Sequence, residues 1–168
     1  IDENCDNIID VSTPAFYTST NVPVIIPAAG ANTVVSTITI SGHVGLITDV
    51  NVNNLNISHT FIDDLIISLK SPSGTQIVLM NRPCASQDNI IINFDSESGN
   101  AYGSFPCPPT NNGTYQSFQP LTAFDGEDPN GTWTLIVQDL FNLDGGTINA
   151  WTLEIPTQAT SPVYYADT

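Results

Sequence analysis

Short runs in which apolar and polar residues alternate dominate this chain, and helical periodicity is almost absent. The alternation is clear in residues 34–40, 50–57, 65–69, 77–79, 132–138 and 151–155. A period of two places successive side chains on opposite faces of an extended strand. Gly, Pro, Asn and Asp bound these runs, as is typical between short strands. The sequence therefore predicts an all-β fold, and the pattern of hairpins and crossovers favours a β-sandwich of the jelly-roll type.

Three local features refine this prediction. The alternation shifts phase at Asn53-Asn54, which indicates one extra residue in a strand, a β-bulge. Residues 71–74 (SPSG) carry turn residues and predict a hairpin between the flanking strands. Residues 90–94 form an apolar-rich run of the kind that is buried on both faces of a sheet.

Composition excludes several classes of function. The 168 residues include 17 Asp or Glu but only 2 Lys or Arg, which gives a formal charge of −15. Binding to nucleic acid or to an anionic membrane surface needs clustered cations, so neither is expected. No apolar run approaches the roughly 20 residues of a spanning helix, so no membrane insertion is expected. Because 40% of the residues are apolar and only 11% are charged, a packed core is possible, and the length suits one domain.

The organisation of the chain follows from where the alternation stops. Residues 1–15 and 157–168 show no sustained pattern and are predicted to be an N-terminal arm and a C-terminal linker, which leaves residues 16–156 as the domain. Residues 96–119 are rich in Gly, Pro, Asn and Ser and predict a long loop. Cys107 lies within this stretch and Cys84 precedes it, so these two are the most plausible disulfide pair, which leaves Cys5 unpaired or bonded outside the chain.

Four ordered motifs resemble one family. Residues 57–65 (ISHTFIDDL) and 69–75 (LKSPSGT) resemble the hallmark of the P domain, also called the P/Homo B domain, of proprotein convertases. Residues 126–135 (GEDPNGTWTL) and 145–153 (GGTINAWTL) are similar to two later signatures of that family. The resemblance implies a jelly-roll β-sandwich over residues 16–156, of the bacterial type. It also implies a non-catalytic module that stabilises and regulates an adjacent subtilisin-like serine endopeptidase, in a secreted or cell-surface protein.

Acidic and amide side chains gather in the predicted loops. Ca²⁺ takes about 6–8 oxygen ligands from carboxylates, amides and backbone carbonyls. A calcium site is therefore predicted, although the same residue types also cap turns by binding their own backbone. The candidate ligands are five carboxylates in or beside these loops. They are Asp64 at the start of a strand, Asp88 and Asp95 around the apolar run 90–94, and Asp139 and Asp144 in the loop before the last strand.

The sequence gives little support for a catalytic triad or for a pair of catalytic carboxylates. His59, Asp64 and Ser71 are the residue types of a nucleophilic triad, but no GxSxG elbow accompanies them. His59 is predicted to be structural, hydrogen-bonded at the end of a strand. Adjacent carboxylates at Asp63 and Asp64 would point to opposite faces of a strand, which is unsuitable for glycoside hydrolysis. Glu127 is expected to accept backbone N–H groups of its own turn.

Aromatic residues distinguish the remaining hypotheses. Trp133 and Trp151 are predicted to fill the core, with an exposed platform for sugar stacking as the alternative. The leading function is the accessory P domain. The alternative is a calcium-dependent carbohydrate- or protein-binding module, which would use Tyr102, Phe105 or Tyr115. A hydrolase is the third hypothesis.

Overall fold

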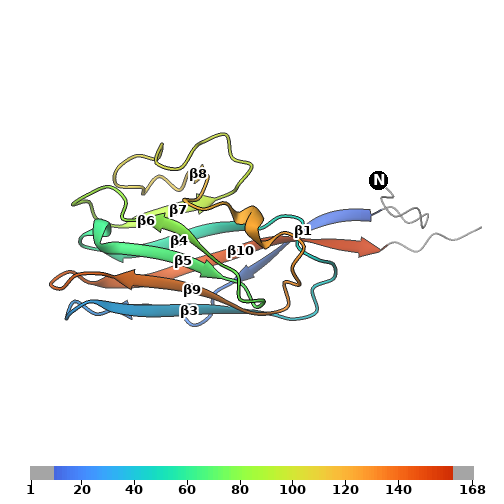
Figure 1. The fold of residues 1–168 in the computed structure, drawn as a ribbon, viewed down its shortest axis with the longest axis horizontal. Coiled ribbons are helices and arrows are strands. Elements are labelled where there is room, and N and C mark those ends of the chain that lie inside the picture. Colours follow the sequence, from blue (N-terminus) through green and yellow to red (C-terminus); the bar gives the residue numbers. More distant parts are fainter. Residues whose placement is uncertain (1–9, 161–168) are drawn as a thin grey trace, which may run out of the picture.

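The computed structural model describes residues 10–160, which form two packed β-sheets with almost no helix (Figure 1). No helix in this part of the chain is long and apolar enough to cross a membrane. The elements, in chain order, are β1 (Asp10–Thr18), β2 (Val24–Ile26), β3 (Asn32–Ile40), β4 (Asn51–His59), η1 (Ile62–Asp64), β5 (Leu65–Lys70), β6 (Gln76–Asn81), β7 (Ile90–Phe94), β8 (Thr114–Tyr115), η2 (Leu121–Phe124), β9 (Gly131–Asp139) and β10 (Gly146–Thr160).

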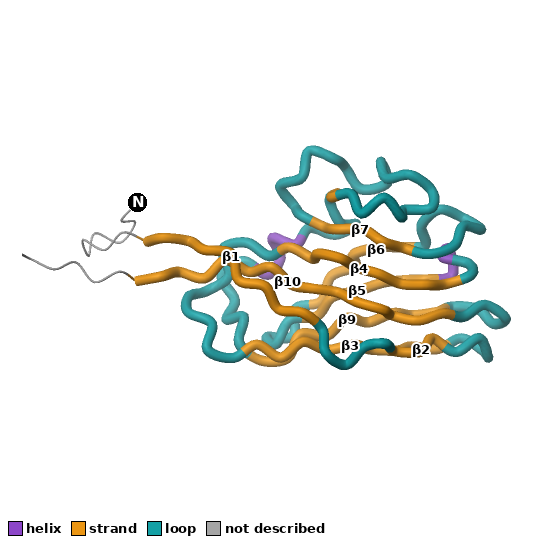
Figure 2. The backbone as a smooth tube through the Cα atoms, turned by 180° about the vertical axis from the view of Figure 1, so that it is seen from behind, coloured by secondary structure: helices purple, strands orange, loops and turns teal. Residues whose placement is uncertain are grey.

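The order of the strands confirms the predicted jelly roll. One sheet has the order β1-β10-β4-β7-β8, with β2 also paired to β10, and the other has the order β3-β9-β5-β6 (Figure 2). The pairs are nested along the chain: β5 pairs with β6, β4 with β7, β3 with β9, and β1 and β2 with β10. This nesting folds one long antiparallel hairpin over into two sheets, which is the jelly-roll arrangement.

The core lies between the two sheets and consists of the inward-facing residues of each alternating run. On β9, Trp133, Leu135 and Val137 are fully buried, whereas the residues between them are partly exposed. Trp133 and Trp151 both have no exposed surface, and each indole N–H has an acceptor, Pro129 O at 2.9 Å and Ser36 Oγ at 2.7 Å respectively. Both tryptophans therefore belong to the core as predicted, and neither is a sugar platform.

The predicted bulge and hairpin are both present. The register between β4 and β7 shifts between Val52 and Leu55, and Asn54 between them has a φ of 51°. Because of the extra residue, Val52 and Leu55 both reach the core. The β5–β6 hairpin closes through a hydrogen bond from Ser71 N–H to Thr75 O of 2.8 Å.

Strand β7 is not buried on both faces, contrary to the prediction. Ile90, Ile92 and Phe94 are fully buried, whereas Ile91 and Asn93 are only partly covered. The long loop lies along the edge of β7 that does not pair with β4, where the N–H of Ile91 donates to Pro109 O at 2.8 Å. In a single β-sandwich each sheet is buried on one face only, so the apolar run of residues 90–94 did not indicate burial on both faces.

Strand pairing extends into the segments predicted as terminal arms. Residues 10–15 pair with residues 155–160 in the register Asp10 to Thr160, and β4 ends its pairing with β10 at Glu154. The result is a two-stranded ribbon that extends beyond the sandwich (Figure 1). Pro14 lies opposite Pro156 in this ribbon. Proline has no N–H to donate, so this pair interrupts the hydrogen-bonding edges of both strands and limits pairing with other chains. Cys5 lies outside the described residues.

Residues 96–119 form the predicted long loop, with only the short β8 inside it. The Cys84–Cys107 disulfide, predicted from the sequence, ties this loop to the end of β6. Its later part also covers the edge of β6, because the N–H groups of Phe118 and Gln119 donate to Leu79 O and Val78 O, both at 2.9 Å. The loop is therefore part of the folded sandwich.

Replacing Cys84 and Cys107 by serine is expected to lower the free energy of unfolding by about 3 kcal/mol, because the disulfide closes a loop with a sequence separation of 23. The midpoint of urea unfolding without reductant measures this loss. Each single serine variant serves as the control and should lose about as much as the double variant. An unchanged midpoint in the double variant would contradict the prediction.

Candidate functional site

A buried histidine and carboxylate join the two sheets at the end of the sandwich opposite the ribbon. His59 ends β4 and Asp139 ends β9, and neither side chain is exposed to solvent. His59 Nε2 lies 3.4 Å from Asp139 Oδ2, and His59 Nδ1 lies 3.0 Å from the carbonyl oxygen of Phe61 and 3.2 Å from its backbone nitrogen. His59 is therefore hydrogen-bonded at the end of a strand, as predicted, with a partner 80 residues away that the sequence did not reveal.

Asp64 lies beside this pair without a hydrogen-bonding partner for its carboxylate in the described part of the chain. It ends η1 and is only 6% exposed. Burial raises the pKa of the Asp64 carboxyl, and the charges of Asp139 and Asp144 raise it further, against a smaller opposing effect of His59. A buried carboxylate near two others and without a donor is an incompletely neutralised charge.

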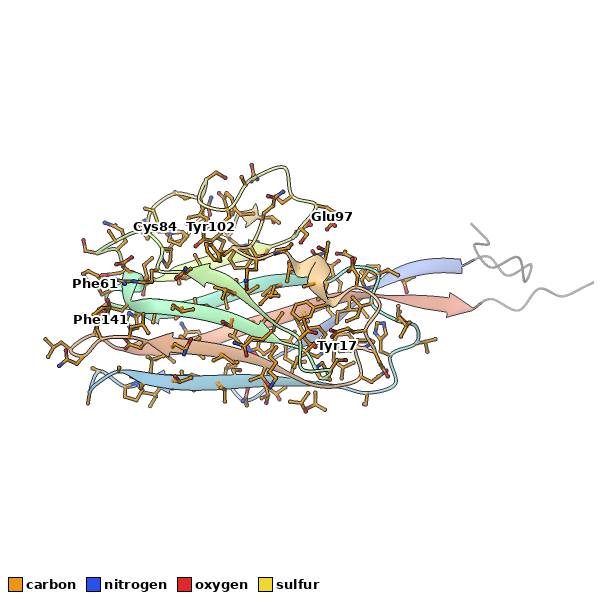
Figure 3. All side chains as sticks on the ribbon, viewed as in Figure 1. Tyr17, Phe61, Cys84, Glu97, Tyr102 and Phe141 are labelled. Atoms are coloured by element: carbon orange, nitrogen blue, oxygen red, sulfur yellow. A yellow bond between two sulfur atoms is a disulfide. The ribbon has the colours of Figure 1, made fainter. Side chains whose placement is uncertain are left out.

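The loop between β9 and β10 supplies the other two carboxylates. Asp139 Oδ1 accepts the N–H of Phe141 at 3.2 Å, and Asp144 Oδ1 accepts the hydroxyl of Thr60 at 2.9 Å. In Figure 3, Phe61 and Phe141 mark this end of the molecule. Among residues 10–160, no group of three or more Asp, Glu, His or Cys side chains is already arranged to hold a metal ion.

The one basic side chain at this end of the described domain, Arg82, forms an ion pair with Asp63 rather than with Asp64. Arg82 pairs with Asp63, with 3.0 Å between Nη2 and Oδ2, and its guanidinium lies 5.3 Å from the centre of the Phe141 ring. The ion pair is substantially exposed, so its own contribution to stability is small. Asp64 therefore receives no direct neutralisation from Arg82.

The two remaining calcium candidates do not join Asp64. Asp88 is exposed and precedes Asn89, whose side-chain oxygen accepts the N–H of His59 at 3.2 Å. Asp95 follows β7 at the other end of the sandwich, where its Oδ1 accepts the N–H of Glu97 at 2.7 Å. The five predicted ligands thus separate into Asp64 with its two neighbours, an exposed Asp88, and a distant Asp95.

Ser71 is also far from His59. It follows the last residue of β5, whereas Asp64 immediately precedes the first, so the whole strand separates them. Six strand residues span roughly 20 Å. His59, Asp64 and Ser71 therefore do not form a catalytic triad.

The predicted role of Glu127 is wrong. Its Oε1 accepts the hydroxyl of Thr75 in the β5–β6 turn, and its Oε2 is buried without a partner. The backbone N–H of the turn is bound instead by the next residue, because Asp128 Oδ1 accepts the N–H of Asn130 at 2.9 Å. Glu127 thus connects two loops, and the shorter Asp128 side chain caps its own turn, as aspartate commonly does.

Comparison with known families identifies the family to which the chain belongs. The family described as the proprotein convertase P-domain matches residues 47–155, which is more than half of the chain and includes β4, η1, β5 and β9. The chain belongs to the proprotein convertase P-domain family. The His59, Asp64 and Asp139 end lies within the matched part of this P domain, whereas β1, β2 and β3 precede it.

Curated relatives of this P domain are larger proteins. Leupeptin-inactivating enzyme 1 from Streptomyces exfoliatus is 29% identical over 126 residues, which cover 75% of this chain and 23% of that protein. Calcium-dependent proteases from Trichormus variabilis and Nostoc sp. are 32% and 33% identical over 104 residues, which cover 60% of this chain and 13% of each protease. The chain therefore spans less than a quarter of the length of these relatives.

Solved structures support the fold. A serine protease of Aeromonas sobria in complex with a chaperone aligns with a TM-score of 0.52 and 18% identity, over 91% of this chain and 27% of the protease. The same serine protease alone aligns with a TM-score of 0.50. The P domain therefore shares its fold with part of this protease chain.

Proposed function

We propose that this P domain is a non-catalytic accessory module of a longer secreted or cell-surface protein, and that it stabilises and regulates an adjacent subtilisin-like serine endopeptidase in the same chain. The match to the P-domain family carries this proposal. Two further observations support it: the chain spans only 13–23% of its curated relatives, and its disulfide suits an oxidising compartment.

Deleting residues 10–160 from the parent protein tests the accessory role. The expected result is a lower melting temperature and a lower yield of active protease, because the deletion exposes the surface on which the P domain packs. The isolated P domain should hydrolyse neither peptides nor glycosides. A parent protease with unchanged melting temperature and yield after deletion would exclude the role.

A bound Ca²⁺ is the second part of the proposal, with Asp64, Asp139 and Asp144 as ligands. Asp64 fits a cation because the residue is only 6% exposed, the charges of Asp139 and Asp144 repel its carboxylate, and no hydrogen-bond donor to that carboxylate is found in the described part of the chain. Closure of the β9–β10 loop would bring the three carboxylates together, and backbone carbonyls and water would complete the six or more ligands that Ca²⁺ takes. Two relatives are named calcium-dependent proteases.

Calcium is expected to raise the melting temperature of the domain. At about 100 times the Kd, a ligand that binds only the folded state adds about 2.7 kcal/mol, or roughly 5–10 °C for a domain of this size. Differential scanning fluorimetry in CaCl₂ and in EGTA measures the increase. Asp64→Asn should abolish it, whereas Asp88→Asn, which removes an exposed charge, should retain it. An equal melting temperature with and without calcium would exclude the site.

The Asp64→Asn variant also distinguishes calcium binding from the repulsion between Asp64 and its neighbouring carboxylates. Because the folded state raises the pKa of Asp64, the cation-free domain loses stability as the pH rises from about 4 through that raised pKa. In EGTA, Asp64→Asn should therefore be as stable as the natural domain at pH 7, or more stable. A clear loss of stability in EGTA would contradict this.

A carbohydrate-binding function receives less support. Phe105 and Tyr115 are only 8% exposed, and Tyr102 is half-buried, so these three rings pack on one another and leave little surface for a sugar. A glycan array with the isolated domain is expected to show no binding that depends on them.

A further inference from the structure

A cavity of about 360 Å³ lies between the long loop and η2, at the end of the sandwich away from Asp64. It falls within the size range of ligand pockets. Glu97, Gln116, Phe118, Pro120 and Thr122 form most of its walls. Figure 3 shows Glu97 above η2. None of these residues takes part in the proposed calcium site.

One wall of the cavity is an aromatic ring that is held in place and still exposed. Phe118 is 48% exposed, although its ring packs edge-to-face on Tyr102 with the centroids 5.3 Å apart. Its backbone N–H is bound to Leu79 O on β6. Tyr102 in turn accepts the N–H of Asn81 at 3.1 Å. The exposed face of Phe118 is therefore fixed by contacts to β6 and the loop.

Glu97 is the one ionisable residue in the lining of this cavity. Burial raises the pKa of its carboxyl, and the nearby carboxyls of Asp95 and Asp49 raise it further. Burial also raises the pKa of Asp49, to which Asp95 and Glu154 add. Glu97 therefore lies among other carboxyl groups, and no basic residue stands beside it in the lining of the cavity.

No basic residue of the chain lines this cavity. The two basic residues are Lys70 and Arg82. Arg82 is paired with Asp63, and Lys70 is an exposed residue at the end of β5. A ligand that fits the cavity must therefore bring positive charge from outside and an apolar or planar surface for Phe118.

We propose that this cavity binds the guanidinium group of an arginine side chain on a peptide or protein partner. A planar guanidinium can stack on an aromatic face and donate two parallel hydrogen bonds to one carboxylate. Phe118 and Glu97 supply these two elements from the walls of one cavity, and the methylene groups of the arginine would lie against Pro120. This binding function is separate from the accessory role and does not depend on it.

Titration of the ¹⁵N-labelled domain with Nα-acetyl-arginine methylamide tests the proposal. Millimolar binding is expected, with amide shifts confined to residues 96–98 and 116–122, and weakening as salt is added. The citrulline analogue has the same shape without the charge and should not bind. Glu97→Gln and Phe118→Leu should each weaken binding at least fivefold, whereas Asp88→Asn, the matched loss of one exposed acid, should leave it unchanged.

Several outcomes would overturn the proposal. Equal binding of the citrulline analogue or of a neutral sugar would show that charge is not recognised. Equal binding of Nα-acetyl-lysine methylamide, which carries an ammonium in place of the guanidinium, would show that the planar group is not recognised. Shifts centred on His59 and Asp64, or displacement of the ligand by millimolar Ca²⁺, would place the site elsewhere or assign it to a metal. Unchanged amide spectra of the folded variants ensure that lost binding is not lost folding.

Discussion

Gly146→Ala is expected to lower the free energy of unfolding by about 3 kcal/mol or more, the largest effect of any single methyl group in this domain. Gly146 begins β10 and lies between two strands, opposite His59 of β4 and Ile26 of β2. A Cβ here would overlap the carbonyl oxygen of Ser58 and lie 2.7 Å from its carbonyl carbon and 2.9 Å from the Cα of His59. Because all three are backbone atoms of a paired strand, a side-chain rotation cannot relieve the overlap.

Urea unfolding followed by tryptophan fluorescence measures the loss, since Trp133 and Trp151 are buried in the folded domain. Gly99→Ala provides the control, because a Cβ at Gly99 meets no atom within 4 Å. This control should change the free energy of unfolding by no more than about 0.5 kcal/mol. A loss of less than about 1 kcal/mol for Gly146→Ala would contradict the close approach of β4 and β10 at this point.

Asp139→Ala is expected to cost about 3–5 kcal/mol, because it removes one member of a fully buried pair. The carboxylate accepts hydrogen bonds from two donors, the His59 ring and the N–H of Phe141. Alanine leaves the buried His59 ring and the partly buried N–H of Phe141 without this acceptor. Asp139→Asn keeps one acceptor oxygen and should cost less, about 1–2 kcal/mol. Measurement in EGTA separates this effect from the proposed calcium site.

A double-mutant cycle with His59→Ala checks that the loss comes from the pair. The interaction energy between the two positions should be at least about 1 kcal/mol. Asp88→Ala is the control for an exposed carboxylate and should be neutral within about 0.5 kcal/mol. Additive effects of the two substitutions would show that His59 and Asp139 contribute independently, which contradicts a shared hydrogen bond.

Strands that alternate could be predicted well because burial on one face imposes the period of two. Val52 and Leu55 both face the core despite the intervening residues, so the phase shift at Asn53-Asn54 was sufficient to locate the bulge. The pairing of Cys84 with Cys107 was predicted because Cys107 lies within one loop and Cys84 precedes it. Strand β1 escaped prediction, since Pro14 interrupts its pattern and its pairing with β10 supplies the stabilisation.

The candidate site was predicted only in part. Asp64, Asp139 and Asp144 were identified because each is a carboxylate in or beside a predicted loop. Nothing in the local sequence separated them from Asp95, which has the same character but follows β7 at the opposite end. Likewise Glu97 lies in a loop without a motif, and its cavity exists only because the two ends of that loop and η2 come together in the fold.

The alternation of apolar residues, the turn residues and the P-domain motifs are local properties, so the sequence alone determines the strands, the sandwich class and the family. Which carboxylates share a site depends instead on the nested pairing of distant strands, which brings Asp139 to His59 across 80 residues. That pairing also sets how deeply Asp64 is buried and therefore how strongly its charge is disfavoured. Because repulsion between charges depends on distance and burial, only the tertiary structure could decide which of these carboxylates carries a disfavoured charge.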